Sequence, residues 1–267
     1  MRQRRATAAA VLLAAGAAFA ASAMTGGSPA PPRAVAVSRP AEPISVPPVT
    51  KPAFVPGAPR WLDRRPLGFL TPVRYVVAAR ARPASNAPIM ATLGTRTPEG
   101  TTNAVTVIGW RRDTWGRLWV RARLPILPTG AIGWLPRRAL GGYRAVHARL
   151  DVDLTRLRLT LHRRDRRVLV APIGIGMAGW DTPRGTFYIR NKLTRYSSPQ
   201  YGPVAFGTSA RSPVATDWPA GGFIGIHGTD RPDLIPGRIS HGCIRLRNED
   251  VLALSRLMPI GTLVRIH

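Results

Sequence analysis

The sequence has few of the features that assign a protein directly to a structural class. It has one cysteine, Cys243, so no disulfide can form within the chain. It has two lysines, Lys51 and Lys192, and its 39 basic residues are otherwise all arginines, against 13 acidic residues. No stretch after residue 23 is long and apolar enough to cross a membrane. These absences exclude a disulfide-stapled scaffold and a multi-span membrane protein.

The formal net charge of +26 is typical of proteins that bind polyanions. The chain nevertheless has no run of basic residues interleaved with aromatics and no nucleic-acid-binding module, so a nucleic-acid partner is not predicted. The preference for arginine, together with 26 glycines and 27 prolines, also fits the codon usage of a GC-rich genome. Either origin leaves a surface expected to adhere to anionic wall polymers.

The first 60 residues read as an export signal and a spacer. A basic start (Met1 to Arg5), an Ala-rich apolar run and the small-x-small site at Ala21-Ser22-Ala23 predict a signal peptide over residues 1–23. A retained membrane anchor is the alternative, but the run is barely long enough to span a bilayer. Residues 24–60, rich in Pro and Ala, predict an extended linker. We therefore expect a protein secreted to the cell wall or periplasmic space, with no membrane span once the signal is cleaved.

Residues 61–142 consist of short apolar segments separated by turn residues, which predicts a small β domain. The predicted strands include VRYVVAA, AVTVIGW, RLWVRARL and AIGWLP. The segment GRLWVRARLPILPTGAIGWLPRRAL resembles the closing hairpin of bacterial SH3-like barrels. Trp119 and Trp134 are expected in the core of this barrel, since buried aromatics hold so small a domain together. Whether the domain binds a ligand is left open.

Residues 143–267 predict a second β domain with one short helix. HARLDVDL, RLRLTLHR, RRVLVAPIGIG and TPRGTFYIRNKL alternate like strands, and TLVRIH supplies a last one. Near the end, Asn248 is a candidate helix cap, and Val251, Leu254 and Leu257 recur at helical spacing. The fold class predicted for the chain is thus mainly β.

Chemistry concentrates around Cys243, in ISHGCIRL. A structural cysteine usually has apolar neighbours, whereas this one follows Ser240-His241-Gly242 and stands two residues before Arg245. A basic, glycine-opened setting is expected to lower a thiol's pKa and expose its sulfur. His227 lies 16 residues upstream, across a loop rich in Pro and Gly that can fold back. The pattern predicts a cysteine nucleophile served by an imidazole.

Two further points follow from the residue types. The backbone N–H groups of Gly242 and Cys243 are candidate donors to an oxyanion. His227, His241 and Cys243 are also ligands that zinc accepts, so a metal site is the rival interpretation. A thiolate–imidazole pair needs neither metal nor cofactor for acyl transfer, and none is predicted.

The stretch IHGTDRPDLIPGRISHGCIRLRNEDVLAL resembles the signature of the L,D-transpeptidase (YkuD-like) catalytic domain. The strand order over about 125 residues fits that family, which implies a β-sandwich-type catalytic domain. The resemblance implies Cys243 as nucleophile and His227 as general acid/base, with Ser240, His241, Gly242, Arg245 and Gly228 shaping the pocket. His241 and Arg245 could instead brace the loop. The interval QYGPVAFGTSARSPVATDWPAGG follows no family pattern, so no substrate contacts are carried over there.

The implied activity is that of a cysteine-dependent acyltransferase of cell-wall biogenesis. Its partners would be peptidoglycan stem peptides, donor and acceptor, joined by 3→3 cross-links through a thioester on Cys243. With water as acceptor, the same site would be an L,D-carboxypeptidase. A wall-binding module with an inactive catalytic fold and a zinc-dependent wall hydrolase are alternatives from other classes.

Overall fold

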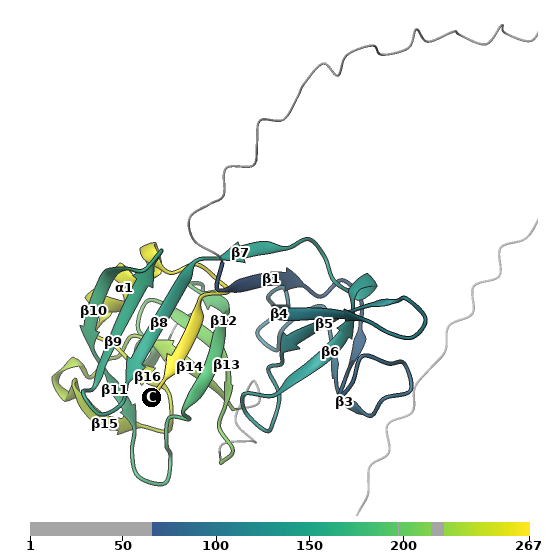
Figure 1. The fold of residues 1–267 in the computed structure, drawn as a ribbon. Helices are drawn as coiled ribbons and strands as arrows, with labels where there is room; N and C mark the ends of the chain where they lie inside the picture. Colours follow the sequence, from purple (N-terminus) through teal and green to yellow (C-terminus); the bar gives the residue numbers. More distant parts are fainter. Residues whose placement is uncertain (1–65, 197, 215–221) are drawn as a thin grey trace, which may run out of the picture. The chain divides into compact units, whose positions relative to one another are not determined.

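A computed structural model describes residues 66–196, 198–214 and 222–267 (Figure 1). All of them belong to one compact unit, Arg60–His267. The predicted signal peptide and linker lie outside the described residues, and so do the first residues of the predicted SH3-like domain. None of the helices in the described part is long and apolar enough to cross a membrane.

The first sheet has seven strands in the order β3-β2-β6-β5-β4-β1-β7, and every neighbouring pair is antiparallel. Its strands are β1 (Gly68–Pro72), β2 (Val77–Arg80), β3 (Ile89–Leu93), β4 (Ala104–Arg112), β5 (Leu118–Arg123), β6 (Ile132–Pro136) and β7 (Arg144–Val146). A 3-10 turn, η1 (Arg137–Ala139), follows β6. The four strands predicted here are confirmed. β1 and β3 were not predicted, because β1 ends on a proline and β3 shows no clear alternation of buried and exposed residues.

The core of this sheet is made of small aliphatic side chains such as Val105, Val120 and Leu135. Trp119 is buried as predicted, and its indole N–H donates to the Asp113 carboxylate at 3.0 Å. Trp134 is half-buried. The resemblance of this part to an SH3-like barrel remains a prediction.

The border between the two sheets lies beyond the one predicted at residues 142 and 143. β7 pairs with β1, with Leu70 opposite Arg144, so it still belongs to the first sheet. The second sheet starts with β8 (Ala148–Asp153). Residues 144–146, which the predicted border placed with the second domain, thus pair in the first sheet.

The second sheet has ten strands in the order β10-β9-β8-β17-β12-β13-β14-β16-β11-β15. Besides β8 they are β9 (Arg158–Arg163), β10 (Arg166–Pro172), β11 (Gly174–Gly176), β12 (Gly185–Leu193), β13 (Ala205–Arg211), β14 (Phe223–His227), β15 (Gly237–Ser240), β16 (Ile244–Arg245) and β17 (Leu263–Ile266). Three neighbouring pairs are parallel: β8 with β17, β11 with β15, and β14 with β16.

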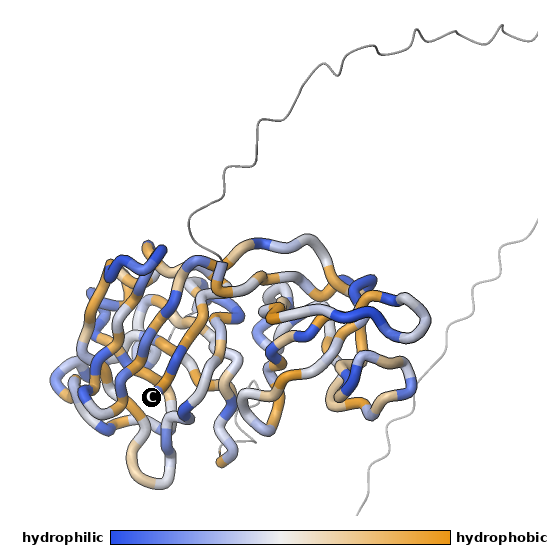
Figure 2. The backbone as a smooth tube through the Cα atoms, viewed as in Figure 1, coloured by the Kyte–Doolittle hydropathy of each residue, from blue (hydrophilic) through white to orange (hydrophobic). Residues whose placement is uncertain are grey.

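This sheet curls around a single core. Leu150 and Leu161 from one half pack in the same buried cluster as Phe206 and Ile226 from the other half. Hydrophobic and hydrophilic residues alternate along strands such as β8 and β9 (Figure 2), as a sheet with one buried face requires. The predictions of a mainly β chain and of a β-sandwich-type second domain are confirmed.

The described residues contain one α-helix, α1 (Asn248–Leu257), at the predicted place. Val251 and Leu254 are its buried side chains and join the core of the second sheet. The predicted cap is wrong: the N-cap is Arg247, without a side-chain hydrogen bond, and Asn248 Oδ1 accepts the backbone N–H of Thr229 at 3.0 Å instead. Asn248 therefore fixes the loop that follows β14.

The two sheets are joined by buried polar contacts. The fully buried Tyr188, on β12, donates its hydroxyl to the carbonyl of Ala104, on β4, at 3.0 Å. Arg123 Nη1 donates to the Thr186 carbonyl at 3.1 Å. The first sheet therefore satisfies polar groups of the second.

We expect Tyr188→Phe to lower the free energy of unfolding by about 0.5–1.5 kcal/mol, because the ring stays packed while one buried hydrogen bond is lost. Tyr188→Ala should cost more, about 3–5 kcal/mol, because it also leaves a cavity. Urea unfolding measures both. Tyr75→Phe, at a ring that is 68% exposed, is the control and should change nothing. A Tyr188→Phe protein as stable as wild type would show that the contact contributes nothing.

Candidate active site

The site is built by the pairing of two short parallel strands. Ile226 of β14 lies opposite Ile244 of β16, and His227 lies opposite Arg245. The intervening segment contains the 3-10 turn η3 (Pro232–Leu234) and β15, which pairs with β11. The chain thus folds back as predicted, so that Cys243, one residue before β16, comes level with Gly225.

The thiol of Cys243 and the imidazole of His227 both lie beside Gly225. The backbone N–H of Gly225 donates to Cys243 Sγ at 3.3 Å. A Cβ added at Gly225 would lie 3.6 Å from that sulfur and 3.4 Å from Cδ2 of His227. The two side chains therefore flank the space that a larger residue at 225 would occupy.

The environment of the thiol differs from the one the sequence suggested. Cys243 is half-buried, and burial raises the pKa of its thiol above the ordinary value, although the Gly225 N–H and the charge of Arg245 act in the opposite direction. A lowered thiol pKa was expected from the basic neighbours, and that expectation is wrong because loss of water outweighs them. At neutral pH the sulfur carries its proton.

His227 is held as a neutral base. Its ring is buried, and Nδ1 lies 2.6 Å from the carbonyl oxygen of Gly228, so Nδ1 carries the proton and Nε2 keeps its lone pair. Burial lowers the pKa of His227 to about 4; the hydrogen bond to Gly228 opposes this effect and the charge of Arg245 adds to it. The Tyr201 ring packs on the imidazole with centroids 4.6 Å apart. A fixed neutral imidazole is suited to accept the thiol proton.

The turn before the cysteine is rigid. Ser240 Oγ donates to the Cys243 carbonyl at 2.6 Å and accepts the Gly242 N–H at 3.1 Å. Thr182 Oγ1 donates to the Gly242 carbonyl at 2.8 Å. Gly242 has φ 112°, a conformation that favours glycine. Because its N–H is engaged by Ser240, Gly242 is not the free oxyanion donor that the sequence predicted, and its part is to form the turn.

A pocket of about 350 Å³ opens over the sulfur. Its lining comprises Gln200, Tyr201, His227, Asp230, Ser240, His241, Cys243 and Arg245. Five of the seven predicted site residues are therefore brought together here. The other two, Gly228 and Gly242, contribute backbone that holds His227 and the turn.

Arg245 and His241 differ in their burial and in their contacts. Arg245 Nε is buried and has no hydrogen-bond partner among the described residues. The Arg245 side chain also lines the pocket, so a cation stands at the pocket wall, where a guanidinium suits a carboxylate. His241 is exposed and its ring meets Trp180 edge to face, with centroids 4.8 Å apart. This contact suits a side chain that braces the rim.

Sequence reasoning missed several residues of the site. Gln200 and Tyr201 lie in the interval with no recognisable pattern, in the 3-10 turn η2 (Pro199–Tyr201). Thr182 acts through a single hydroxyl and has no spacing signal. Gly225 could have been suspected, since it interrupts an otherwise apolar strand beside a motif histidine.

The rival interpretation, a zinc site, requires several ligand side chains close together. Over the described ranges, no group of three His, Cys, Asp or Glu side chains stands close enough to hold an ion. His241 points its ring at Trp180. A chelator experiment below tests the metal interpretation in solution.

We expect His227→Gln to slow acylation of Cys243 by about 10²–10⁴-fold, the usual contribution of a positioned proton acceptor. Because the imidazole pKa is near 4, the acid limb of the wild-type rate should lie near pH 4 and not near 6.5. Rates of acyl-enzyme formation from pH 3 to 9 measure both. His241→Gln is the control and should lose much less. An acid limb between pH 6 and 7, or equal losses in both variants, would contradict the assignment.

The comparisons with known proteins concern the second sheet. The family profile described as the L,D-transpeptidase catalytic domain (YkuD) matches residues 147–266. Relatives include the putative L,D-transpeptidase YkuD of Bacillus licheniformis, 37% identical over 118 residues, which are 44% of this chain and 64% of that protein. The probable L,D-transpeptidase YbiS of Escherichia coli is 34% identical over 142 residues, covering 45% of this chain and 44% of the relative. The chain thus spans about half to two thirds of these relatives.

Among solved structures, the catalytic domain of an Enterococcus faecium L,D-transpeptidase is 23% identical with a TM-score of 0.35, covering 45% of this chain and 96% of that one. An L,D-transpeptidase from Mycobacterium smegmatis is 14% identical with a TM-score of 0.37, covering 56% and 90%. The family match covers the stretch that carries the Cys243 site, and the sequence relatives bear the name of the same family. Residues 147–266 of this chain thus match the L,D-transpeptidase (YkuD) catalytic domain.

Proposed function

We propose that this protein is a secreted L,D-transpeptidase that forms 3→3 cross-links between peptidoglycan stem peptides. The observation that carries the proposal is that Cys243 Sγ and the neutral His227 ring both lie beside Gly225 and line one pocket, whose wall includes Arg245. The family match of residues 147–266 supports the same reaction class.

In the first half-reaction, the donor is a stem peptide with a terminal D-residue. Nε2 of His227 takes the proton from Cys243 as the sulfur attacks the carbonyl carbon of the third residue. The C–N bond to the terminal D-alanine then breaks, and His227 returns the proton to the leaving amine. The D-alanine carboxylate is a group that the guanidinium of Arg245, which lines the pocket, would bind. A thioester on Cys243 remains.

In the second half-reaction, the side-chain amine of another stem attacks the thioester. Sulfur leaves, His227 removes a proton from the amine and returns it to the sulfur, and a 3→3 amide is formed. Water in place of the amine would give the carboxypeptidase reaction at the same site. Gln200, Tyr201 and Asp230 also line the pocket, and the carboxylate of Asp230 would suit the amine of an acceptor stem.

The predicted signal peptide and the charge of +26 fit a location at the cell wall. There, an arginine-rich surface would hold the enzyme near anionic polymers and near its polymeric substrate. Release of bound protein by moderate salt would be the sign of such an interaction.

The experiment that tests the function is incubation of the protein with a disaccharide-tetrapeptide, followed by mass spectrometry of the products. We expect a cross-linked dimer lighter than two substrates by one D-alanine, and no product from Cys243→Ala, which should fold normally. Cys243→Ser should be nearly inactive, since a hydroxyl is much harder to deprotonate. A tenth of the wild-type turnover in the alanine variant would rule out the nucleophile. Disaccharide-tripeptide as the sole product would establish the carboxypeptidase alternative.

A carbapenem should acylate the same sulfur, because a strained β-lactam carbonyl is an electrophile within reach of it. Intact-mass measurement should show one drug molecule added, on the Cys243 peptide, at an unchanged rate after dialysis against a chelator. Cys243→Ala is the control and should gain no mass. If the chelator stopped acylation and zinc restored it, Cys243 would be a metal ligand and the mechanism above would be wrong.

A further inference from the structure

The first sheet supplies a carboxylate to a buried cation of the catalytic domain. Arg190, on β12, is 2% exposed, and its Nη2 lies 2.8 Å from Oε1 of Glu99. Its guanidinium also stacks on the ring of Phe223, 3.6 Å from the centroid. Glu99 belongs to the loop between β3 and β4, 91 residues earlier in the chain. A buried arginine depends on such a partner, because an uncompensated charge away from water is costly.

The loop presents Glu99 in a fixed way. The N–H of Thr97 donates to the Thr101 carbonyl at 2.8 Å, and their hydroxyls lie 2.8 Å apart. Gly100 closes the turn with φ 77°. The Arg190 charge and hydrogen bonds lower the pKa of Glu99 against the opposing effect of its burial, the largest single influence on that carboxyl. Glu99 is therefore an ionised group on a preformed turn.

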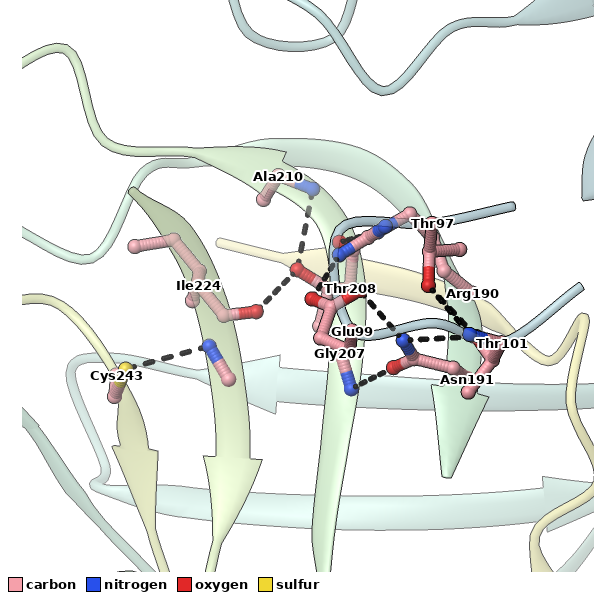
Figure 3. Close-up of polar contacts among 11 residues, drawn as sticks. Thr97, Glu99, Thr101, Arg190, Asn191, Gly207, Thr208, Ala210, Ile224 and Cys243 are labelled. Carbon is pink, nitrogen blue, oxygen red and sulfur yellow. Dashed lines mark hydrogen bonds and ion pairs between the residues drawn. The ribbon is translucent and has the colours of Figure 1, made fainter. Parts of the chain in front are cut away.

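From Glu99, polar contacts cross β12 (Figure 3). Glu99 Oε2 accepts a hydrogen bond from Nδ2 of Asn191 at 3.0 Å. Asn191 Oδ1 in turn accepts one from the backbone N–H of Gly207, on β13, at 2.9 Å. Arg190 Nε donates to the Thr208 carbonyl at 2.8 Å. These side-chain bonds occur where the register between β12 and β13 shifts, between Ile189 and Asn191. They replace ladder hydrogen bonds that the irregularity interrupts.

The contacts continue to the strand beside the nucleophile. Between β13 and β14 the register shifts again, between Gly207 and Arg211. There Thr208 Oγ1 donates to the Ile224 carbonyl at 2.7 Å and accepts the Ala210 N–H at 3.1 Å. The next residue on β14 is Gly225, whose N–H donates to Cys243 Sγ (Figure 3). A series of contacts thus connects Glu99 to the thiol, and each contact fixes the position of a strand.

We propose that Glu99 is a positioning residue for the catalytic centre: by neutralising Arg190 it sets β12, β13 and β14 so that Gly225 holds the Cys243 sulfur. The first sheet is then a structural part of the catalytic unit, beyond any role in binding the wall. The inference rests on the proposed function only for its turnover readout.

The test uses Glu99→Gln in the full chain, which keeps the shape of the side chain and removes its charge. Because Cys243 is the only cysteine, alkylation by iodoacetamide reports on that sulfur alone. Weakening the Gly225 hydrogen bond removes a stabiliser of the thiolate, so the alkylation profile should move to higher pH. Cross-linking turnover should fall about 10–100-fold, mainly in kcat, as expected when a nucleophile is misplaced.

The matched control is Leu135→Ala, in the core of the first sheet, which lowers stability without touching Arg190. Measured well below its melting temperature, it should keep the wild-type alkylation profile. A Glu99→Gln protein with the wild-type alkylation profile and turnover, or one no different from Leu135→Ala, would overturn the proposal. A shifted profile together with absent cross-linking in the wild type would support the positioning role and reject the proposed function.

Arg190→Met and the double variant with Glu99→Gln show whether Glu99 acts through Arg190. If it does, the double variant should be no worse than Arg190→Met alone. Should Glu99→Gln fail to fold, the double variant, which lacks the buried charge, carries the test. Folding with the same shifted profile as Arg190→Met would support the proposal. Fully additive losses, or a wild-type profile in the double variant, would contradict it.

Discussion

The parallel pairing of β14 with β16 is the constraint on which the active centre depends. Two residue pairs, Ile226 with Ile244 and His227 with Arg245, define the register. A slip of one residue would turn His227 away from the pocket and move the Gly225 N–H away from the sulfur, because side chains alternate along a strand. The buried isoleucines secure that register from the core side. Burial of these two side chains thus secures the register on which the site depends.

The electrostatics of the site indicate how the sulfur is activated. With the thiol pKa raised and the His227 pKa near 4, the resting pair is neutral. In the proposed mechanism, proton transfer to His227 would therefore accompany attack of the sulfur on the carbonyl. Such a thiol is protected from adventitious oxidation while no substrate is bound, since the thiolate is the species that reacts. In the proposed mechanism, Arg245 would then bind substrate, and its charge would favour the thiolate.

Most residues of the candidate site could be predicted from the sequence, whereas fewer of the contacts that hold them in place could be. Cys243 stood out as the single cysteine, between Gly242 and Arg245, and His227 as a histidine 16 residues upstream across a loop that can fold back. Most strands were visible through alternation, whereas the partners of strands were not, as β7 showed. The contacts of Glu99 with Arg190 were invisible, because they join residues 91 apart at a bulge and no local pattern marks such a pair. The raised thiol pKa was missed for a related reason: burial is a property of the assembled fold.

In the proposed function Cys243 is an acyl carrier, and trapping that carrier is the most direct test. Wild-type protein is mixed with a tetrapeptide stem, quenched in acid within the first turnover, and digested for peptide mass spectrometry. The proposed function predicts a tripeptide attached to the Cys243 peptide, with one equivalent of D-alanine released and an adduct labile to hydroxylamine. Release of D-alanine with no adduct at any quench time, under conditions that preserve thioesters, would contradict it.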